Sequence, residues 1–236
     1  MSDSVPLYVD DSYLREFDAV VVRSGPRFVV LDATAFYPEG GGQPSDTGTL
    51  EAGGKTLKVL KAMKRGDQTF HYLDGDLPEG AKVHGAVDWG RRLTHMRLHS
   101  AEHLLTGLFE AEGSGLKVFS SFSQLDFQPS AIDEATLRRV HDRFDSIVEE
   151  DAPVTIYYTS REELDVGDDA RKRSFLEKMP LGVHTLRMVK IGGYALTFCM
   201  GTHVKSTAEI GRLRSLRLET KKKQRMIVYF ELDNVK

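Results

Sequence analysis

Four side chains in this sequence have the types and spacing of metal ligands. His99 and His103 lie four residues apart in a stretch with helical apolar spacing, and residues at that separation share one face of a helix. The single cysteine, Cys199, is followed four residues later by His203. One thiolate and three imidazoles form a donor set that suits zinc. The sequence therefore predicts one Zn²⁺ site, and these four residues are also the candidates for catalysis.

Each of these residues has another interpretation. The two histidine positions also suit satisfied core or surface histidines, and a lone cysteine also occurs as a small apolar core residue or as a nucleophile. Four protein ligands normally close a structural zinc site, so the sequence leaves a structural and a catalytic zinc both open. Glu102 precedes His103 instead of following His99, which disfavours a metalloprotease of the HExxH type, and we expect Glu102 to face solvent.

A glycine-rich stretch, AFYPEGGGQPSDTG at 35–48, follows a predicted strand. Consecutive glycines allow positive φ and close approach of a ligand to the backbone. No GK[ST] follows, so the stretch is not a Walker loop; a flexible hairpin is the alternative to a binding loop. With polar residues elsewhere, it supplies the candidate substrate contacts, which are Gly40, Gly41, Gly42, Gln43, Asp46, Ser123, Met200 and Thr202.

Basic residues are concentrated in three short stretches, 61–65, 89–97 and 211–225. The formal net charge of −3 argues against a general nucleic-acid binder, but local basic stripes can hold a phosphate backbone. A solvated surface is the alternative for each stripe. The candidate RNA contacts are Arg91, Arg92, Arg97, Arg212, Arg214, Arg217, Lys221, Lys222, Lys223 and Arg225.

The pattern of apolar residues changes near residues 88–93. Before this point, short β-branched and aromatic runs separated by Gly, Asp and Pro predict a small barrel or sandwich. After it, helical patterns at 91–113 and 130–150 alternate with strands at 116–128, 153–160, 211–220 and 224–232. The stretch 184–199 predicts two strands joined at Gly192-Gly193, and 161–178 is predicted as helical or irregular. The fold class is therefore α+β, with domains at 1–90 and 91–236.

Composition bounds the class of protein. The 236 residues are 40% hydrophobic and 28% charged, which is typical of a folded soluble chain. No apolar run reaches the roughly 20 residues that cross a membrane, and the acidic N-terminus has no signal-peptide core. A single cysteine suits a reducing compartment. We therefore expect a cytoplasmic protein with no membrane association.

Three segments together resemble one family. HSAEHLL at 99–105 and CMGTHVKSTAEIG at 199–211 resemble the signatures of the alanyl-tRNA synthetase editing domain, and FYPEGGGQPSDTG at 36–48 resembles the motif that precedes it. A chain of this size with all three is similar to the medium-length type of the free-standing AlaX family. Met200 and Ala208 stand where that family usually has glycine, which leaves the predicted ligands intact and bears on amino-acid selectivity.

The resemblance implies an N-terminal β-barrel whose glycine-rich loop faces an editing pocket, followed by an α+β editing domain with antiparallel strands and helices. It implies zinc held by the HxxxH and CxxxH residues, and ATP-independent hydrolysis of mischarged tRNA(Ala), carrying serine or, in some members, glycine. The partner would be that tRNA; no obligate protein partner is evident. Within this reading, zinc would orient substrate and water, or activate the water, and bound Cys199 is a poor nucleophile.

Two other functions remain open at this point. One is a zinc-stabilised RNA-binding module without catalysis, for which metal removal would unfold the chain but no ester would be hydrolysed. The other is editing of a different mischarged tRNA, such as seryl-tRNA(Thr), because threonyl-tRNA synthetase shares the second domain. The GGGQPSDTG stretch argues against the threonyl alternative.

Overall fold

The computed structural model describes residues 4–114, 117–121, 123–128, 130–164, 176, 182 and 184–234. Its contacts divide the chain into two compact units, which are described separately. One unit comprises Met1–Met96 together with Gly201–His203, and the other comprises Arg97–Met200 together with Val204–Lys236. The first unit is therefore discontinuous in sequence, because three residues from the distant 201–203 segment belong to it.

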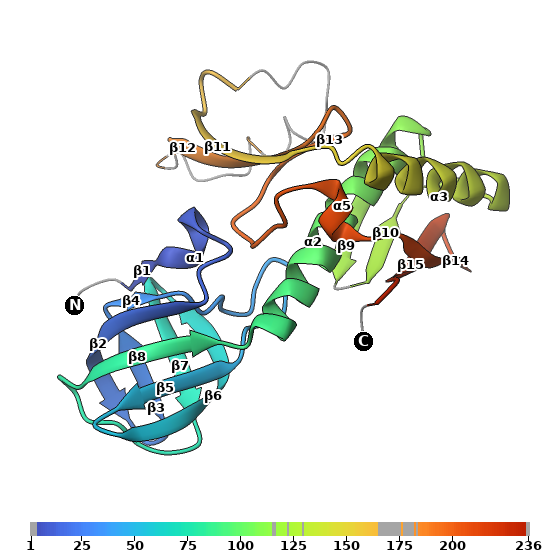
Figure 1. Ribbon diagram of the computed structural model, residues 1–236. Helices are drawn as coiled ribbons and strands as arrows, with labels where there is room; N and C mark the ends of the chain where they lie inside the picture. The colour runs from blue at the N-terminus through green and yellow to red at the C-terminus, as the bar shows by residue number, and fades with distance from the viewer. Residues whose placement is uncertain are drawn as a thin grey trace. The chain divides into compact units, whose positions relative to one another are not determined.

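The first unit contains a closed six-stranded barrel (Figure 1). Every neighbouring pair is antiparallel in the order β2-β3-β7-β6-β5-β8. The strands are β2 Glu16–Gly25, β3 Phe28–Leu31, β5 Gly48–Ala52, β6 Lys55–Arg65, β7 Gln68–Leu73 and β8 Lys82–Val87. A short helix, α1 Leu7–Asp10, follows β1 Val5–Pro6, which pairs in parallel with β4 Ala33–Thr34. Of the two architectures left open by the sequence, the structure has the barrel.

Alternation of side chains explains why these segments close around a core. Strand β8 alternates exposed and buried positions, so every second side chain points inward. Val21, Leu31, Leu50, Val59 and Leu73 are among the apolar side chains that fill the interior. Register shifts in β2 and β6 increase local twist, as closure of a small sheet requires.

Most of the second unit consists of helices and two antiparallel sheets. Helix α2 Trp89–Ala111 contributes residues to both units, and α3 Glu134–Glu149 and α5 Thr207–Ile210 lie in the second. One sheet has the order β14-β15-β10-β9 and the other β11-β12-β13. Their strands are β9 Lys117–Ser121, β10 Gln124–Phe127, β11 Val154–Ser160, β12 Thr185–Ile191, β13 Ala195–Phe198, β14 Leu213–Lys221 and β15 Arg225–Leu232. The α+β class is thus confirmed.

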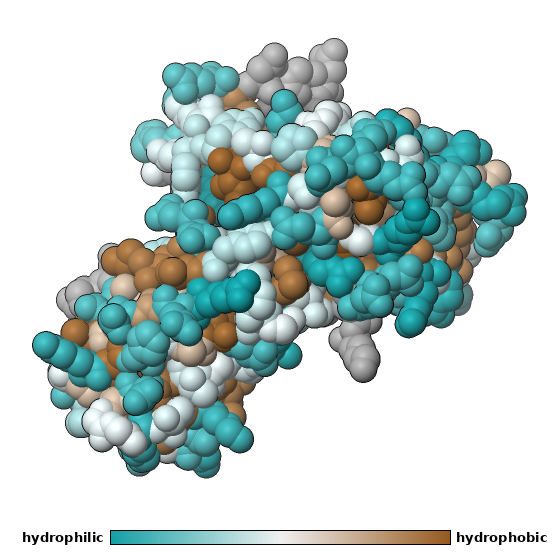
Figure 2. Space-filling view, viewed as in Figure 1, coloured by the Kyte–Doolittle hydropathy of each residue, from teal (hydrophilic) through white to brown (hydrophobic). Residues whose placement is uncertain are grey.

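Local capping and periodicity account for the helices. Asp133 caps α3, with Oδ1 accepting a hydrogen bond from the Thr136 amide at 2.7 Å, as expected for an N-terminal aspartate. Phe144 and Ile147 are among the side chains that α3 buries, while the face of this helix shown in Figure 2 is mostly hydrophilic. Asp88 caps α2 by accepting from the Arg91 amide at 3.2 Å.

The second unit differs from the sequence prediction at 116–128, and the segment 161–178 is mostly undescribed. The single strand predicted at 116–128 is wrong, because β9 and β10 form an antiparallel hairpin in which Ser121 pairs with Gln124. The serine-rich stretch at its centre favours a turn, which interrupts the extended run. The segment 161–178, predicted as helical or irregular, lies largely outside the described residues.

Helix α2 approaches the β12–β13 hairpin closely. A Cβ atom added to Gly107 would lie 2.2 Å from the carbonyl oxygen of Tyr194, in the turn between these strands. Only glycine allows the helix backbone to lie against this turn. The contact holds the hairpin that immediately precedes Cys199 beside the helix that carries His99.

No helix among the described residues has the length and apolar character needed to cross a membrane.

His71 gives the barrel a pH dependence. It is fully buried, with Nε2 2.8 Å from the Thr34 hydroxyl, and burial lowers its pKa to about 4, against a smaller opposing effect of the Val29 carbonyl. The unfolded chain takes up this proton near pH 6.5. Its contribution to stability is therefore complete above pH 6.5 and is lost as pH falls through about 4.

We expect His71 to reduce the free energy of unfolding by up to about 3 kcal/mol between pH 6.5 and 4. Urea denaturation across this range should show a shallower pH dependence in His71→Gln than in wild type. NMR titration of the imidazole supplies the direct check, and a His71 resonance titrating near pH 6.5 would contradict the expectation.

Candidate functional site

The four predicted ligands come together in the structure. The donor atoms of His99, His103, Cys199 and His203 all lie within 4.8 Å of one another. The two imidazoles on α2 stack with ring centroids 4.8 Å apart, and Cys199 Sγ lies 3.4 Å from His99 Nε2. This cluster could hold a metal ion.

The donor set fits zinc in chemistry and in size. In a tetrahedral site with bonds of about 2.0–2.3 Å, ligand atoms lie about 3.4–3.6 Å apart, so the observed separations need only small side-chain adjustments. The three histidines are buried, whereas Cys199 is half-buried and the next residue, Met200, is 57% exposed. The cysteine side of the cluster is therefore open to solvent.

Cys199 is fixed by the neighbouring strand β12. Its amide donates to the Arg187 carbonyl at 3.2 Å, and Arg187 Nη1 donates to the Cys199 carbonyl at 2.6 Å. Arg187 is buried, and its hydrogen bond to the Cys199 carbonyl brings the guanidinium charge close to the thiol-bearing residue. The sequence analysis missed this residue; the available signal was an arginine placed between the apolar residues Leu186 and Met188 of a predicted strand.

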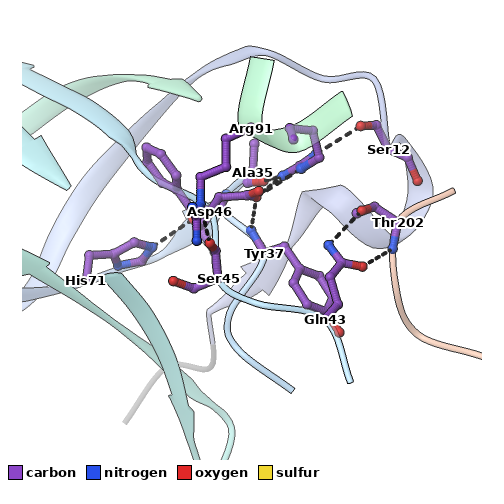
Figure 3. A network of polar contacts seen from close by, with 12 residues as sticks. Ser12, Ala35, Tyr37, Gln43, Ser45, Asp46, His71, Arg91 and Thr202 are labelled. Carbon is purple, nitrogen blue, oxygen red and sulfur yellow. Dashed lines mark hydrogen bonds and ion pairs between the residues drawn. The ribbon is translucent and has the colours of Figure 1, made fainter. Parts of the chain in front are cut away.

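The glycine-rich segment holds the residue that precedes His203. Gln43 Nε2 donates to the Thr202 hydroxyl at 2.9 Å, and the Thr202 amide donates to Gln43 Oε1 at 3.2 Å. Figure 3 shows the two side chains facing each other across these bonds. The His203 amide donates in turn to Ser12 Oγ at 3.4 Å. Two successive backbone amides of the 201–203 segment are thus bound by side chains from residues 1–96 of the first unit.

A buried ion pair between Asp46 and Arg92 anchors the glycine-rich segment, and Figure 3 shows Asp46 close to Ala35 and Tyr37. Arg92 is completely buried and bonds to Asp46, to the Ser12 carbonyl at 2.9 Å and to the Ala35 carbonyl. Asp46 also accepts from the Tyr37 amide at 2.6 Å. Burial raises the pKa of Asp46, and the Arg92 guanidinium opposes that rise. The pair joins the start of α2 to both ends of the glycine-rich segment.

The predicted substrate contacts divide into two groups. Gln43, Asp46 and Thr202 are buried and bonded to protein groups, so the structure gives them a different environment from the one expected. Gly40, Gly41 and Gly42 are exposed in a turn. Ser123 is exposed in the turn between β9 and β10, and Met200 is exposed beside Cys199.

The predicted RNA contacts divide into buried or bonded residues and exposed ones. Arg92 is a correction, because a fully buried guanidinium bonded to Asp46 cannot meet RNA. Arg97 donates to the carbonyls of Ile210, Asp233 and Asn234, and burial lowers its pKa. The exposed members are Arg91, Arg212, Arg214, Arg217, Lys221, Lys222, Lys223 and Arg225.

Most of the exposed cations on the β14–β15 hairpin already have acidic partners. Arg212 pairs with Glu149, and Arg225 makes a bidentate contact with Asp126. Arg214 and Lys221 also pair with carboxylates, and Arg217 lies over the Tyr229 ring. Lys222 and Lys223, in the turn between the strands, have no acidic partner in the described part of the chain. They are the least neutralised cations of this stripe.

Glu102 is also a correction. It was expected on a solvent-facing stripe of its helix, but it is buried, with Oε1 accepting from the Thr106 hydroxyl at 3.1 Å. Its Oε2 lies 3.8 Å from His103 Nε2. The reason is that residues 98–105 of α2 are buried on every side, so this part of the helix has no solvent stripe.

Both the N-terminal and the C-terminal part of the chain match a known protein family. A family model described as tRNA synthetases class II (A) matches residues 10–91, and one described as threonyl and alanyl tRNA synthetase second additional domain matches residues 186–229. The first match includes the glycine-rich segment, and the second includes Cys199 and His203.

Similarity to individual proteins extends over nearly the whole chain. The alanyl-tRNA editing protein AlaX-M of Methanosarcina barkeri is 36% identical over 242 residues, covering 96% of this chain and 98% of the relative. The AlaX-M of Methanosarcina acetivorans is 36% identical with the same coverage. The alanine–tRNA ligase of Thermoplasma acidophilum is 37% identical over 90% of this chain but only 25% of its own length. The chain therefore belongs to the AlaX-M family of alanyl-tRNA editing proteins.

Proposed function

We propose that this protein is a trans-editing hydrolase that removes the wrong amino acid from mischarged tRNA(Ala). Seryl-tRNA(Ala) is the principal substrate and glycyl-tRNA(Ala) a further one, and no ATP is consumed. The observation that supports this most directly is the His99, His103, Cys199 and His203 cluster, in a chain related to editing proteins over nearly its full length. We assign the glycine-rich motif to a domain at 1–90 and the editing activity to a domain at 91–236, of which residues 91–96 and 201–203 cluster with the first compact unit.

We assign one Zn²⁺ to the four-residue cluster. When bound, zinc supplies a Lewis acid at the scissile ester or at water. The ester is already activated, so the protein's main tasks are to orient the substrate and to stabilise the developing oxyanion. Cys199 acts as a ligand and not as a nucleophile, because a metal-bound thiolate is already engaged. The three buried imidazoles exclude bulk water from their side of the centre.

Selection against correct alanyl-tRNA follows from hydrogen bonding. A pocket that bonds the serine hydroxyl leaves buried polar groups unpaired when alanine enters, which strongly disfavours alanine. Met200 is exposed beside Cys199, in a position to contact the aminoacyl end, and Ser123 offers an exposed hydroxyl. Gly40, Gly41 and Gly42 are exposed and carry no side chain that would block close approach of the tRNA end.

Mischarged tRNA(Ala) is the proposed partner. Lys222 and Lys223 are the strongest candidates for phosphate contacts, because both are exposed and neither faces a carboxylate in the described chain. Arg91, in the first turn of α2, is a further exposed candidate. Phosphate contacts of this kind would weaken as salt concentration rises. With a single cysteine and an ordinary soluble composition, we propose a cytoplasmic location.

A deacylation time course tests this function. Purified protein is incubated with Ser-tRNA(Ala), Gly-tRNA(Ala), Ala-tRNA(Ala) and Ser-tRNA(Thr), and loss of each ester is compared with spontaneous hydrolysis. We expect fast loss of serine from tRNA(Ala), loss of glycine, and survival of the alanyl ester. Intact esters in all four reactions, from folded protein that contains zinc, would favour a non-catalytic RNA-binding module. Selective loss from tRNA(Thr) would favour threonyl editing.

A further inference from the structure

We infer that Gln43 is a positioning residue for the metal centre, which it serves by fixing Thr202 and thereby His203. The inference deepens the proposed function and rests on it, since the centre is the one proposed to carry the reaction. It also assigns a physical purpose to the glycine-rich segment, whose polar residues were expected to contact the substrate directly.

Gln43 and Thr202 form a two-bond contact inside the protein. The side-chain amide donates to the Thr202 hydroxyl and accepts from the Thr202 backbone amide, at 2.9 and 3.2 Å. Gln43 is 2% exposed and Thr202 is fully buried. Because both ends of the amide are used, its orientation is fixed, and loss of Gln43 would remove the hydrogen bond that satisfies the buried Thr202 amide.

The contact acts on His203 through the backbone. Gln43 binds the amide of residue 202, and Ser12 Oγ binds the amide of residue 203 at 3.4 Å. The Ser12 carbonyl is itself held by Arg92 Nη1 at 2.9 Å. With two successive amides bound, the main chain that carries the imidazole has little freedom, so the ligand is oriented before metal arrives. Partners that orient a ligand in this way raise metal affinity.

The three glycines serve the same geometry. The amide of Gly40 donates to the Gln43 carbonyl at 3.1 Å, and the amide of Gln43 donates to the Gly40 carbonyl at 3.0 Å. The two central residues, Gly41 and Gly42, have φ of 58° and 85°. A tight turn with positive φ at both central positions demands residues such as glycine. The turn places the Gln43 side chain against Thr202.

Metal affinity measured on the full-length protein tests the inference without any tRNA. Zn²⁺ affinity is obtained by competition with a chromophoric chelator, and the geometry of the site by the visible spectrum of the Co²⁺-loaded protein. We expect Gln43→Ala to weaken Zn²⁺ binding about tenfold or more and to alter the Co²⁺ bands. Gln68→Ala, the same change at a half-buried glutamine of β7, is the matched control and should match wild type.

Substitutions at the partner separate positioning from general damage. Thr202→Val removes the hydroxyl but keeps the backbone amide and the side-chain volume, so it should weaken Zn²⁺ binding less than Gln43→Ala. Thr202→Ser restores the hydroxyl and should bind Zn²⁺ nearly as wild type does. The double variant Gln43→Ala/Thr202→Val should be no weaker than Gln43→Ala, because both changes remove one contact.

The outcomes are distinguishable. Wild-type Zn²⁺ affinity and an unchanged Co²⁺ spectrum in folded Gln43→Ala would overturn the inference; a fall in deacylation alone would then make Gln43 a direct substrate contact. Should Gln43→Ala not fold, the contrast between Thr202→Val and Thr202→Ser decides the matter in the same terms. Weakened metal binding in a protein that hydrolyses no ester would retain the positioning role and reject the proposed function.

Discussion

Replacement of Cys199 by alanine is expected to lower the rate of seryl-tRNA(Ala) hydrolysis by about 100-fold or more. The substitution leaves three imidazoles and removes the only thiolate, so the affinity of the cluster for zinc falls sharply. A Lewis acid contributes several kcal/mol to transition-state stabilisation, and each 1.36 kcal/mol corresponds to a factor of ten in rate. The loss should appear in kcat/KM under single-turnover conditions.

Zinc content and stability are measured on the same preparations. Ser215→Ala, which removes one polar atom from a half-buried residue of β14, is the control and should keep both zinc and activity. The Cys199→Ala protein should retain the far-UV circular dichroism of the fold while containing less than one zinc per chain. Full activity in metal-free Cys199→Ala would show that the reaction needs neither the thiolate nor the metal.

Breaking the Asp46–Arg92 pair is expected to destabilise the protein by about 3–5 kcal/mol. Both side chains are fully buried, and Arg92 also satisfies the carbonyls of Ser12 and Ala35. In Arg92→Leu, the Asp46 carboxylate keeps the Tyr37 amide but loses its cationic partner. The carbonyls of Ser12 and Ala35 each lose a donor inside the protein, which adds to the cost. Urea denaturation followed by circular dichroism measures the change in the free energy of unfolding.

Two further variants make this result specific. Arg91→Leu changes the adjacent arginine, which is exposed and makes one bond to the Ser45 carbonyl, and should cost about 1 kcal/mol or less. The double variant Asp46→Leu/Arg92→Leu should be less unstable than the sum of the single changes, because no charge is left without its partner. Equal losses in the free energy of unfolding for Arg91→Leu and Arg92→Leu would show that the buried ion pair stabilises the protein no more than an exposed arginine does.

Local signals in the sequence were sufficient for the two spaced pairs of candidate ligands and for most elements, whereas the meeting of the two pairs depends on the tertiary fold. His99 and His103 share a helix face at any tertiary arrangement, and Asp133 caps α3 through a contact three residues away. Alternation of apolar residues, together with turn residues, predicts the barrel strands. Closure into a barrel instead of a sandwich could not be predicted, because it depends on pairing between distant strands, such as β2 with β8.

The features that could not be predicted from the sequence are those that depend on burial by distant parts of the chain. The adjacent residues Arg91 and Arg92 were both predicted as surface cations. Arg92 is instead buried, where it forms an ion pair with Asp46, 46 residues earlier in the chain. Glu102 was expected on a polar stripe that does not exist, since α2 is covered on all sides at this point. The contact between Gln43 and Thr202 spans 159 residues, and no local pattern encodes it.

The membership of Gly201–His203 in the first unit has a consequence for the order of synthesis. A ribosome adds about 5–20 residues per second, so the hundred or so residues after Met96 take roughly 5–20 s to appear. During that interval the barrel strands are available to fold, but Gln43 and Ser12 cannot yet form their hydrogen bonds to Thr202 and to the His203 amide, because those residues have not been synthesised. A nascent chain therefore contains His99 and His103 well before Cys199 and His203 are made, so the four-residue donor set is completed only after the rest of the barrel unit has been synthesised.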